Sequence, residues 1–327
     1  MFKLGVYRMD QFQGPRSIRG RLSQNRISFH LLRGPASADQ VRLFECAMPQ
    51  IRLSNGVYRT TSRARFKEFD PFVNAVLAKH FEPSRELQVH DWAASDCIAS
   101  SEWATALWSC FPNAWVTASD LTLFVIETEL PGGEIFIWEP NGELLQYVRP
   151  PFVVRLSPPE HPLMVVNRIL EWHARNKFQR LQGSWKIPQE WIASDRVDAL
   201  DLPPFVFRKI PLIHPQADAL RRSSDRFSII RHSAFEALER PCDVIRTMNI
   251  FNLKYFPAVK IEEGIEAVRR SLSPGGIWIV GRTFGEDPPV HGASVLIKDG
   301  EGFRLLERFG EGSEVESLIH GCTDVVR

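Results

Sequence analysis

Residues 87–120 read LQVHDWAASDCIASSEWATALWSCFPNAWVTASD, and this stretch decides the fold. Residues 87–92 alternate or run apolar as in a strand, and residues 115–120 form a second such run that ends in an aspartate. The residues between them carry apolar side chains at helical spacing, and Ser100 or Ser101 can cap that helix. The order strand, helix, strand predicts a βαβ unit with parallel strands and a right-handed crossover.

Regular α/β alternation flanks this unit on both sides. A helix is expected from Phe66 to Phe81, because Pro83 ends the helical pattern after Phe81. Downstream, FSIIRH, CDVIRTM and IWIVGR read as strands, residues 260–272 read as a helix, and GASVLIK with FRLLERF reads as a closing antiparallel hairpin. The sequence therefore predicts an α/β fold with a Rossmann-like, doubly wound, mostly parallel sheet and an antiparallel C-terminal strand.

Between these α/β segments the hydrophobic period changes to two. TLFVIE, EIFIWEP and ELLQYV are separated by proline-glycine and asparagine-glycine turns, which predicts an inserted antiparallel β meander. A helix is expected over residues 161–178, including Leu163, and residues 180–224 show no clear pattern. The expected organisation is an irregular basic N-terminal arm over residues 1–60, an α/β domain in two parts over residues 61–124 and 225–327, and an insertion over residues 125–224.

The N-terminal segment has a local basic bias. In the first 35 positions a single acid, Asp10, faces seven cations: Lys3, Arg8, Arg16, Arg19, Arg21, Arg26 and Arg33. Such a bias permits phosphate binding or a solvated arm. The solvated arm is favoured because few aromatic residues interleave the cations, so nucleic acid is not an expected partner.

The composition excludes several protein classes. Apolar residues make up 44% of the 327 positions, charged residues 24%, and the formal charge is +1, which excludes collagen-like, disordered and coiled-coil chains. The five scattered cysteines indicate reduced thiols, and no apolar run approaches the roughly 18 residues of a membrane span. We therefore expect a cytoplasmic protein without a membrane partner. Zinc-protease, P-loop and serine-hydrolase motifs are absent from the sequence.

The loop after the first strand is the place to expect a ligand, because open α/β sheets bind ligands beyond the carboxyl ends of their strands. It reads Asp91-Trp92-Ala93-Ala94-Ser95-Asp96-Cys97, and its small side chains allow a ligand to approach the backbone. Asp120 can accept hydrogen bonds from ribose hydroxyls. Alternatively, the small residues serve packing, neighbouring amides hold Asp91 for structural reasons, and Asp120 caps a turn.

In this context the sequence resembles the class I S-adenosylmethionine-dependent methyltransferases. VHDWAASDC lies where that family has V-x-D-x-G-x-G-x-G, VTASD lies where it has the second strand with a ribose-binding acid, and RHSAFEAL lies where an adenine-flanking loop is expected. CDVIRTMNIFNLKYF is similar to the fourth strand of the chemotaxis-receptor, or CheR-type, methyltransferases. The resemblance covers roughly residues 66–124 and 225–318.

The resemblance implies S-adenosylmethionine as the cofactor, and it implies a set of cofactor-binding residues: Asp91, Ala93, Ser95, Asp96, Cys97, Asp120, Leu121, Ser233, Ala234 and Asn249. Three features depart from the family pattern. Cys97 replaces the last glycine, the chain after Asp120 is extended instead of helical, and Ser233 stands where many relatives have an acid. A positive φ at Cys97 would cost about 1 kcal/mol.

The expected function is methyl transfer to an acceptor that is either a small molecule or a protein side chain. Arg246, Asn249 and Tyr255 are expected on the acceptor side, although Arg246 can equally be an ion-paired arginine. No catalytic acid or base is assigned, because methyl transfer needs chiefly orientation and exclusion of water. The alternative function is a catalytically silent protein of the same fold that binds a partner. The sequence does not indicate the oligomeric state.

Overall fold

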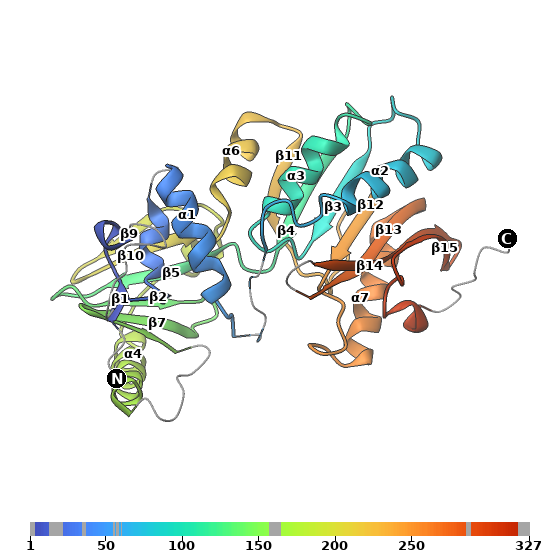
Figure 1. Ribbon diagram of the computed structural model, residues 1–327. Coiled ribbons are helices and arrows are strands. Elements are labelled where there is room, and N and C mark those ends of the chain that lie inside the picture. Colours follow the sequence, from blue (N-terminus) through green and yellow to red (C-terminus); the bar gives the residue numbers. More distant parts are fainter. Residues whose placement is uncertain are drawn as a thin grey trace. The chain divides into compact units, whose positions relative to one another are not determined.

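The structure is a computed structural model of the chain. It describes residues 4–12, 22–34, 37–54, 56, 59, 61–156, 165–285 and 289–319. The chain divides into two compact units (Figure 1). Unit 1 comprises Met1–Thr60 and Thr122–Pro215, and unit 2 comprises Thr61–Leu121 and Gln216–Arg327.

Unit 2 contains a seven-stranded sheet in the order β11-β4-β3-β12-β13-β14-β15. The strands are β3 (Gln88–Trp92), β4 (Trp115–Asp120), β11 (Phe227–Arg231), β12 (Cys242–Met248), β13 (Leu272–Phe284), β14 (Val290–Asp299) and β15 (Gly302–Phe309). The first five strands in this order are mutually parallel, whereas β14 is antiparallel to both of its neighbours. The sheet is therefore mixed, with its antiparallel part at the C-terminal end of the chain.

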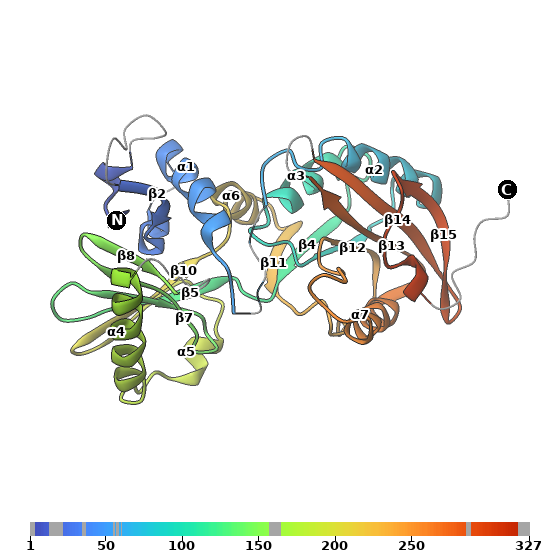
Figure 2. The same ribbon diagram turned by 60° about the horizontal axis from the view of Figure 1, so that its bottom comes forward.

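Helices cover both faces of this sheet. They are α2 (Phe69–His80), α3 (Ile98–Leu107), α6 (Pro215–Ser223, which crosses the boundary between the units) and α7 (Ala258–Ser271), followed by the short helix η4 (Glu316–Leu318). Figures 1 and 2 show α2 and α3 on one face of the sheet and α7 on the opposite face.

The α2 helix follows from the apolar spacing of its sequence. Phe69, Val73, Val76 and Leu77 recur every three or four residues, and all four side chains are buried. This confirms the helix expected between Phe66 and Phe81, with a start three residues later.

The strand register brings the functional loops to one edge of the sheet. Trp92 of β3 pairs with Ser119 of β4 and with Thr247 of β12, and Asp120 of β4 pairs with Arg231 of β11. Because these strands are parallel, their carboxyl ends meet at the same edge. The strand order also reverses here, since β4 and β12 lie on opposite sides of β3.

Unit 1 contains a six-stranded antiparallel sheet in the order β8-β7-β6-β5-β10-β9, with a parallel pair β1-β2 beside it. The strands are β1 (Leu4–Val6), β2 (Leu22–Ile27), β5 (Phe124–Glu129), β6 (Ile135–Trp138), β7 (Leu144–Arg149), β8 (Phe152–Arg155), β9 (Ala199–Leu202) and β10 (Phe205–Pro211). The helices are η1 (Met9–Gln11), η2 (Phe29–Arg33), α1 (Ala38–Ala47), η3 (Met48–Gln50), α4 (Val165–Gln182) and α5 (Gln189–Ala193).

The two faces of the unit 1 sheet pack against different helices. Ile137 of β6 belongs to a buried cluster with Phe44 of α1, while the neighbouring Phe136 and Trp138 place their rings 5.3 and 6.0 Å from that of Phe178 on α4. Side chains alternate across a strand, so β6 alone supplies both layers. The segment of residues 180–224, which showed no pattern in the sequence, contributes β9 and β10, and β10 pairs with β5.

The expectation of an irregular, solvated arm over residues 1–60 is wrong for the described residues. Ser37 accepts a hydrogen bond from Gln40 N and caps α1, whose Leu43 and Phe44 are buried in the unit 1 core. Arg26 is also buried, and it donates to the Val153 carbonyl over 3.2 Å. Buried apolar side chains therefore hold this segment in the fold. Lys3, Arg16, Arg19, Arg21 and Leu163 lie outside the described residues.

Candidate functional site

The loop between β3 and α3 has an unusual backbone conformation. Ala93, Ser95 and Cys97 have φ values of 54°, 58° and 64°. Residues with a Cβ atom rarely adopt positive φ, and each such residue costs about 1–2 kcal/mol relative to the right-handed region. These three positions are the ones that the sequence aligned with three glycines. Backbone strain of this kind is concentrated at functional sites in proteins.

Hydrogen bonds to the neighbouring strand hold this loop in place. Ala94 N donates to the Ser119 carbonyl over 2.8 Å, and Ser95 N donates to Oδ2 of Asp120 over 2.8 Å. The loop is thus hydrogen-bonded to the end of β4 through one backbone acceptor and one side-chain acceptor. Asp120 is partly exposed, and Leu121 beside it is exposed.

The N-cap position of α3 is Cys97, and the side chain that accepts from the first helical N–H is Asp96, not Ser100 or Ser101. The helix begins at Ile98, whose N–H donates to Oδ1 of Asp96 over 3.1 Å. Ser100 and Ser101 lie inside the first turn, where Ser101 Oγ donates to the Ile98 carbonyl. The sequence-based cap was wrong because a side chain two residues before Ile98 satisfies its N–H, so the helix starts earlier.

Asp91 lies at the centre of a buried ion cluster. Arg246 of β12 donates through Nε to Oδ1 of Asp91 over 2.9 Å and through Nη1 to Oδ1 of Asp70 over 2.9 Å. Ser100 Oγ donates to Oδ2 of Asp91 over 2.5 Å, and the guanidinium lies 4.0 Å from the ring centroid of Trp103. All of these groups are on the face of the sheet that carries α2 and α3.

The expectation that Arg246 faces an acceptor is therefore wrong. Its side chain is fully buried and pairs with two carboxylates. Burial disfavours the charged guanidinium, but Asp91 and Asp70 outweigh this effect and raise the pKa of Arg246. Burial raises the pKa of Asp70 to about 7, against the opposing effect of Arg246. Sequence reasoning missed Asp70, although a carboxylate next to Phe69 on the buried face of a helix is a signal of a buried ion pair.

The segment after β11 lies beside the same loop. His232 N donates to the Asp120 carbonyl over 3.2 Å, and the His232 ring lies 4.8 Å from the ring of Trp92. Ser233 Oγ accepts a hydrogen bond from Phe235 N over 3.3 Å, and Ala234 is buried. Burial lowers the pKa of His232, so its imidazole is neutral at pH 7. Sequence reasoning missed the pair of Trp92 and His232, because nothing local connects β3 with the end of β11.

Asn249 connects the ends of β12 and β13. It has a φ of 66°, its N–H donates to the Gly281 carbonyl over 2.8 Å, and its Oδ1 accepts the N–H of Thr283 over 2.7 Å. Asn249 is thus at the predicted sheet edge, where its side chain has a structural partner. Tyr255 follows in the same segment and is exposed.

The structure brings most of the predicted site residues to one edge. Those at the carboxyl ends of β3, β4 and β11 are Ala93, Ser95, Asp96, Cys97, Asp120, Leu121, Ser233 and Ala234. Asn249 is at the end of the adjacent β12, whereas the Asp91 carboxylate points into the α2 and α3 layer. Within the described ranges, no cluster of three or more histidine, cysteine, aspartate or glutamate side chains could hold a metal, and no helix has the length and hydrophobicity needed to cross a membrane.

No protein-family model and no curated protein matches this chain. The sugar N-methyltransferase KedS8 from Streptoalloteichus sp ATCC 53650 aligns with a TM-score of 0.32 and 12% identity, covering 78% of each chain. A S-adenosylmethionine-dependent methyltransferase from Clostridium acetobutylicum ATCC 824 aligns with a TM-score of 0.29 and 12% identity, covering 77% of this chain and 78% of that one. One from Geobacter sulfurreducens, in complex with S-adenosyl-L-homocysteine, has a TM-score of 0.29 and 12% identity over 75% of this chain and 55% of that one. TM-scores this low assign neither a family nor an activity to the chain.

Proposed function

We propose that unit 2 binds S-adenosylmethionine at the carboxyl ends of β3, β4 and β11 and transfers its methyl group to an acceptor. The observation that carries the proposal is the run of positive φ values at Ala93, Ser95 and Cys97, directly before the N-terminus of α3 and against Asp120. A glycine-rich phosphate or nucleotide loop uses such a path so that a ligand can approach the backbone.

The residues at this edge fit an adenosyl group. Asp120 is partly exposed and offers a carboxylate for ribose hydroxyls. Ser233 and Ala234 lie next to it, beyond the end of β11, in a position to flank an adenine. The side chains of Ala93 and Ser95 are small and only partly buried. The cofactor, when bound, supplies a methyl group on a positively charged sulfur.

Asp91 has a positioning role in this proposal. Its carboxylate is buried and bonded to Arg246 and Ser100, so it fixes the end of β3 to α3 and thereby the start of the loop. The protein's own contribution to methyl transfer is to orient the acceptor and to exclude water, which requires no catalytic acid or base. We also propose that the protein is similar to CheR-type enzymes. We further propose a cytoplasmic location, because the cysteines of the described residues form no disulfide.

Calorimetry with S-adenosylmethionine and S-adenosylhomocysteine tests this function. We expect saturable binding of both compounds by the full chain, and we expect mass spectrometry of the denatured protein to detect any adenosyl compound that copurifies. Asp299→Ala is the matched control for Asp120→Ala, because Asp299 is an exposed carboxylate in the β14–β15 hairpin. An absence of heat and of any thermal shift with both compounds would refute the proposal and favour a silent, partner-binding protein.

A further inference from the structure

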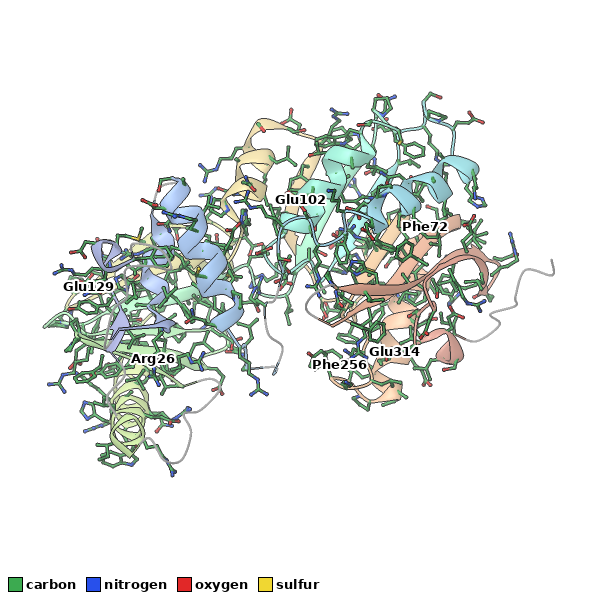
Figure 3. All side chains as sticks on the ribbon, in the orientation of Figure 1. Arg26, Phe72, Glu102, Glu129, Phe256 and Glu314 are labelled. Carbon is green, nitrogen blue, oxygen red and sulfur yellow. The ribbon has the colours of Figure 1, made fainter. Side chains whose placement is uncertain are left out.

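The segment between β11 and β12 runs from the proposed cofactor site to the hydrophobic layer beneath α7. Its residues 232–241 form neither a helix nor a strand. Phe235 packs against Phe251 and against Phe256, which is labelled in Figure 3, with ring centroids 5.9 and 5.0 Å apart. These contacts fix the middle of the segment on the face of the sheet that carries α7.

His232 fixes the start of this segment. Its N–H donates to the Asp120 carbonyl over 3.2 Å, and its ring centroid lies 4.8 Å from that of Trp92. Trp92 is 1% exposed, so it gives the His232 ring a fixed support. Ser233 and Ala234, the two residues proposed to flank an adenine, come directly after His232 in the chain. Their position at the cofactor site therefore depends on the contacts of His232.

The surroundings of the His232 ring suit its neutral form. Nε2 is buried without a hydrogen-bond partner among the described residues, so Nδ1 is the ring nitrogen that donates to the backbone of Glu236. A protonated imidazole carries an N–H on both nitrogens, and the second N–H would be buried here without an acceptor. Burial accordingly lowers the pKa of His232, although the exposed carboxylate of Glu236 opposes this effect.

Two other titratable groups lie near the His232 ring, and neither is bonded to its Nε2. His90 is on the same face of β3 as Trp92, its Nδ1 is also buried without a partner, and burial and His232 lower its pKa to about 4. The carboxylate of Asp120, at the end of β4, accepts the N–H of Ser95. Protonation of His232 therefore favours a conformation in which the ring leaves Trp92 and reaches water.

We propose that His232 is a positioning residue for the cofactor, and that proton uptake by its ring weakens cofactor binding. This inference rests on the proposed function. The neutral ring stays on Trp92 and keeps Ser233 and Ala234 at the cofactor site. When the ring is protonated, these two residues lose their support, and the adenine loses one wall of its site. The effect is reciprocal, so the bound cofactor makes the ring harder to protonate.

Calorimetry of the full chain with S-adenosylhomocysteine tests the proposal. At about pH 8 we expect His232→Ala to bind about tenfold more weakly than the wild type, because it lacks both the ring and the hydrogen bond to the Glu236 backbone. His232→Asn should bind within about threefold of the wild type, since its amide N–H takes the place of Nδ1–H. His80→Ala is the matched control and should bind like the wild type, because His80 is an exposed histidine at the end of α2.

The pH dependence of binding distinguishes a neutral positioning ring from a side chain that only fills space. The affinity of the wild type should fall as the pH decreases below 6.5, the ordinary pKa of histidine, by at most about tenfold per pH unit for one proton. His232→Asn cannot take up this proton, so its affinity should fall less. NMR of the wild type gives a second readout: the His232 ring should titrate below pH 6.5, and at a still lower pH once S-adenosylhomocysteine is bound.

The outcomes separate this inference from the proposed function. Equal affinity of His232→Ala and the wild type, or the same pH dependence in the wild type and His232→Asn, overturns the inference and leaves the proposed function intact. If the wild type binds no S-adenosylhomocysteine at any pH, the proposed function is refuted, and the inference with it. Thermal unfolding shows whether His232→Ala is folded. If it is not, the pH dependence of the wild type and His232→Asn decides.

Discussion

The backbone N–H of Ser95 donates to the carboxylate of Asp120 over 2.8 Å, so the loop after β3 is tied to the end of β4 by the residue expected to hold a ribose. Asp120 therefore has two roles in the proposed function. It shapes the loop through its hydrogen bond with Ser95 N, and a carboxylate is the kind of group that accepts hydrogen bonds from ribose hydroxyls.

Replacement of Asp120 should weaken cofactor binding. We expect Asp120→Ala to lower the affinity for S-adenosylhomocysteine by about 1–3 kcal/mol, because a ligand hydroxyl loses its acceptor. Asp120→Asn keeps an acceptor for Ser95 N, so it should retain the loop and lose only the charge-assisted part of the affinity. Isothermal calorimetry on both variants measures the effect. Equal affinity of Asp120→Ala and the wild type would show that no ribose binds at the end of β4.

Cys97 should destabilise the protein through its backbone. Its φ of 64° suits glycine, and its side chain is fully buried. Cys97→Ala removes the thiol and keeps the Cβ atom, whereas Cys97→Gly removes both. We expect the glycine variant to be about 0.5–1 kcal/mol more stable than the alanine variant, since the relief of strain exceeds the entropy gained by the unfolded chain. Urea unfolding of the pair measures this difference, and a more stable alanine variant would show that the conformation carries no strain.

Local patterns in the sequence were sufficient to predict much of unit 2. The apolar spacing of residues 69–80 predicts α2, and the strand-helix-strand pattern of residues 87–120 predicts β3, α3 and β4. The positions of Ala93, Ser95 and Asp120 at one sheet edge follow from parallel pairing. These predictions succeed because each depends on residues close together in the chain.

The sequence did not reveal features that depend on distant partners. β10 joins the inserted sheet by pairing with β5, about 80 residues away, and α1 is buried because Phe44 belongs to a core cluster that also includes the distant Ile137. The ion cluster joins Arg246 to Asp70 across 176 positions. No local periodicity reports such a pairing, and the local clues to it were an arginine within a buried strand and a carboxylate on the buried face of a helix.

Removal of Arg246 should strongly destabilise unit 2. We expect Arg246→Leu to lower the free energy of unfolding by about 3–5 kcal/mol, because Asp91 and Asp70 would remain buried without a counter-charge. Urea unfolding measures the loss. Arg85→Leu is the control, because Arg85 is half exposed and its pair with Asp243 should contribute only about 0–1 kcal/mol.

The triple variant Arg246→Leu/Asp91→Asn/Asp70→Asn tests the cause of that loss. It removes the uncompensated charges, so it should recover a large part of the stability. If the triple variant is no more stable than Arg246→Leu, lost packing of the arginine stem against Trp103 explains the effect, and the charges do not.

The stability of unit 2 should decrease in acid because of His90. Burial and the neighbouring His232 lower the pKa of His90 from 6.5 to about 4. Between these values the unfolded chain binds a proton that the folded chain does not, so the free energy of unfolding falls with decreasing pH by at most about 1.4 kcal/mol per pH unit for this residue. Above pH 6.5 this contribution is complete and constant. His90→Gln should remove this contribution. As the pH falls from 6.5 to 4, the free energy of unfolding of the wild type should therefore decrease relative to that of the variant.

Asp70 acts in the opposite direction, because burial raises its pKa to about 7 and the folded state then gains stability from protonation below that value. This contribution is present in both proteins and cancels in their difference. His80→Gln serves as the control, since His80 is exposed at the end of α2 and its replacement should leave a much flatter difference. Urea unfolding at a series of pH values gives the curves. Parallel curves for the wild type and His90→Gln would contradict this prediction, because they would mean that His90 is protonated within the folded protein.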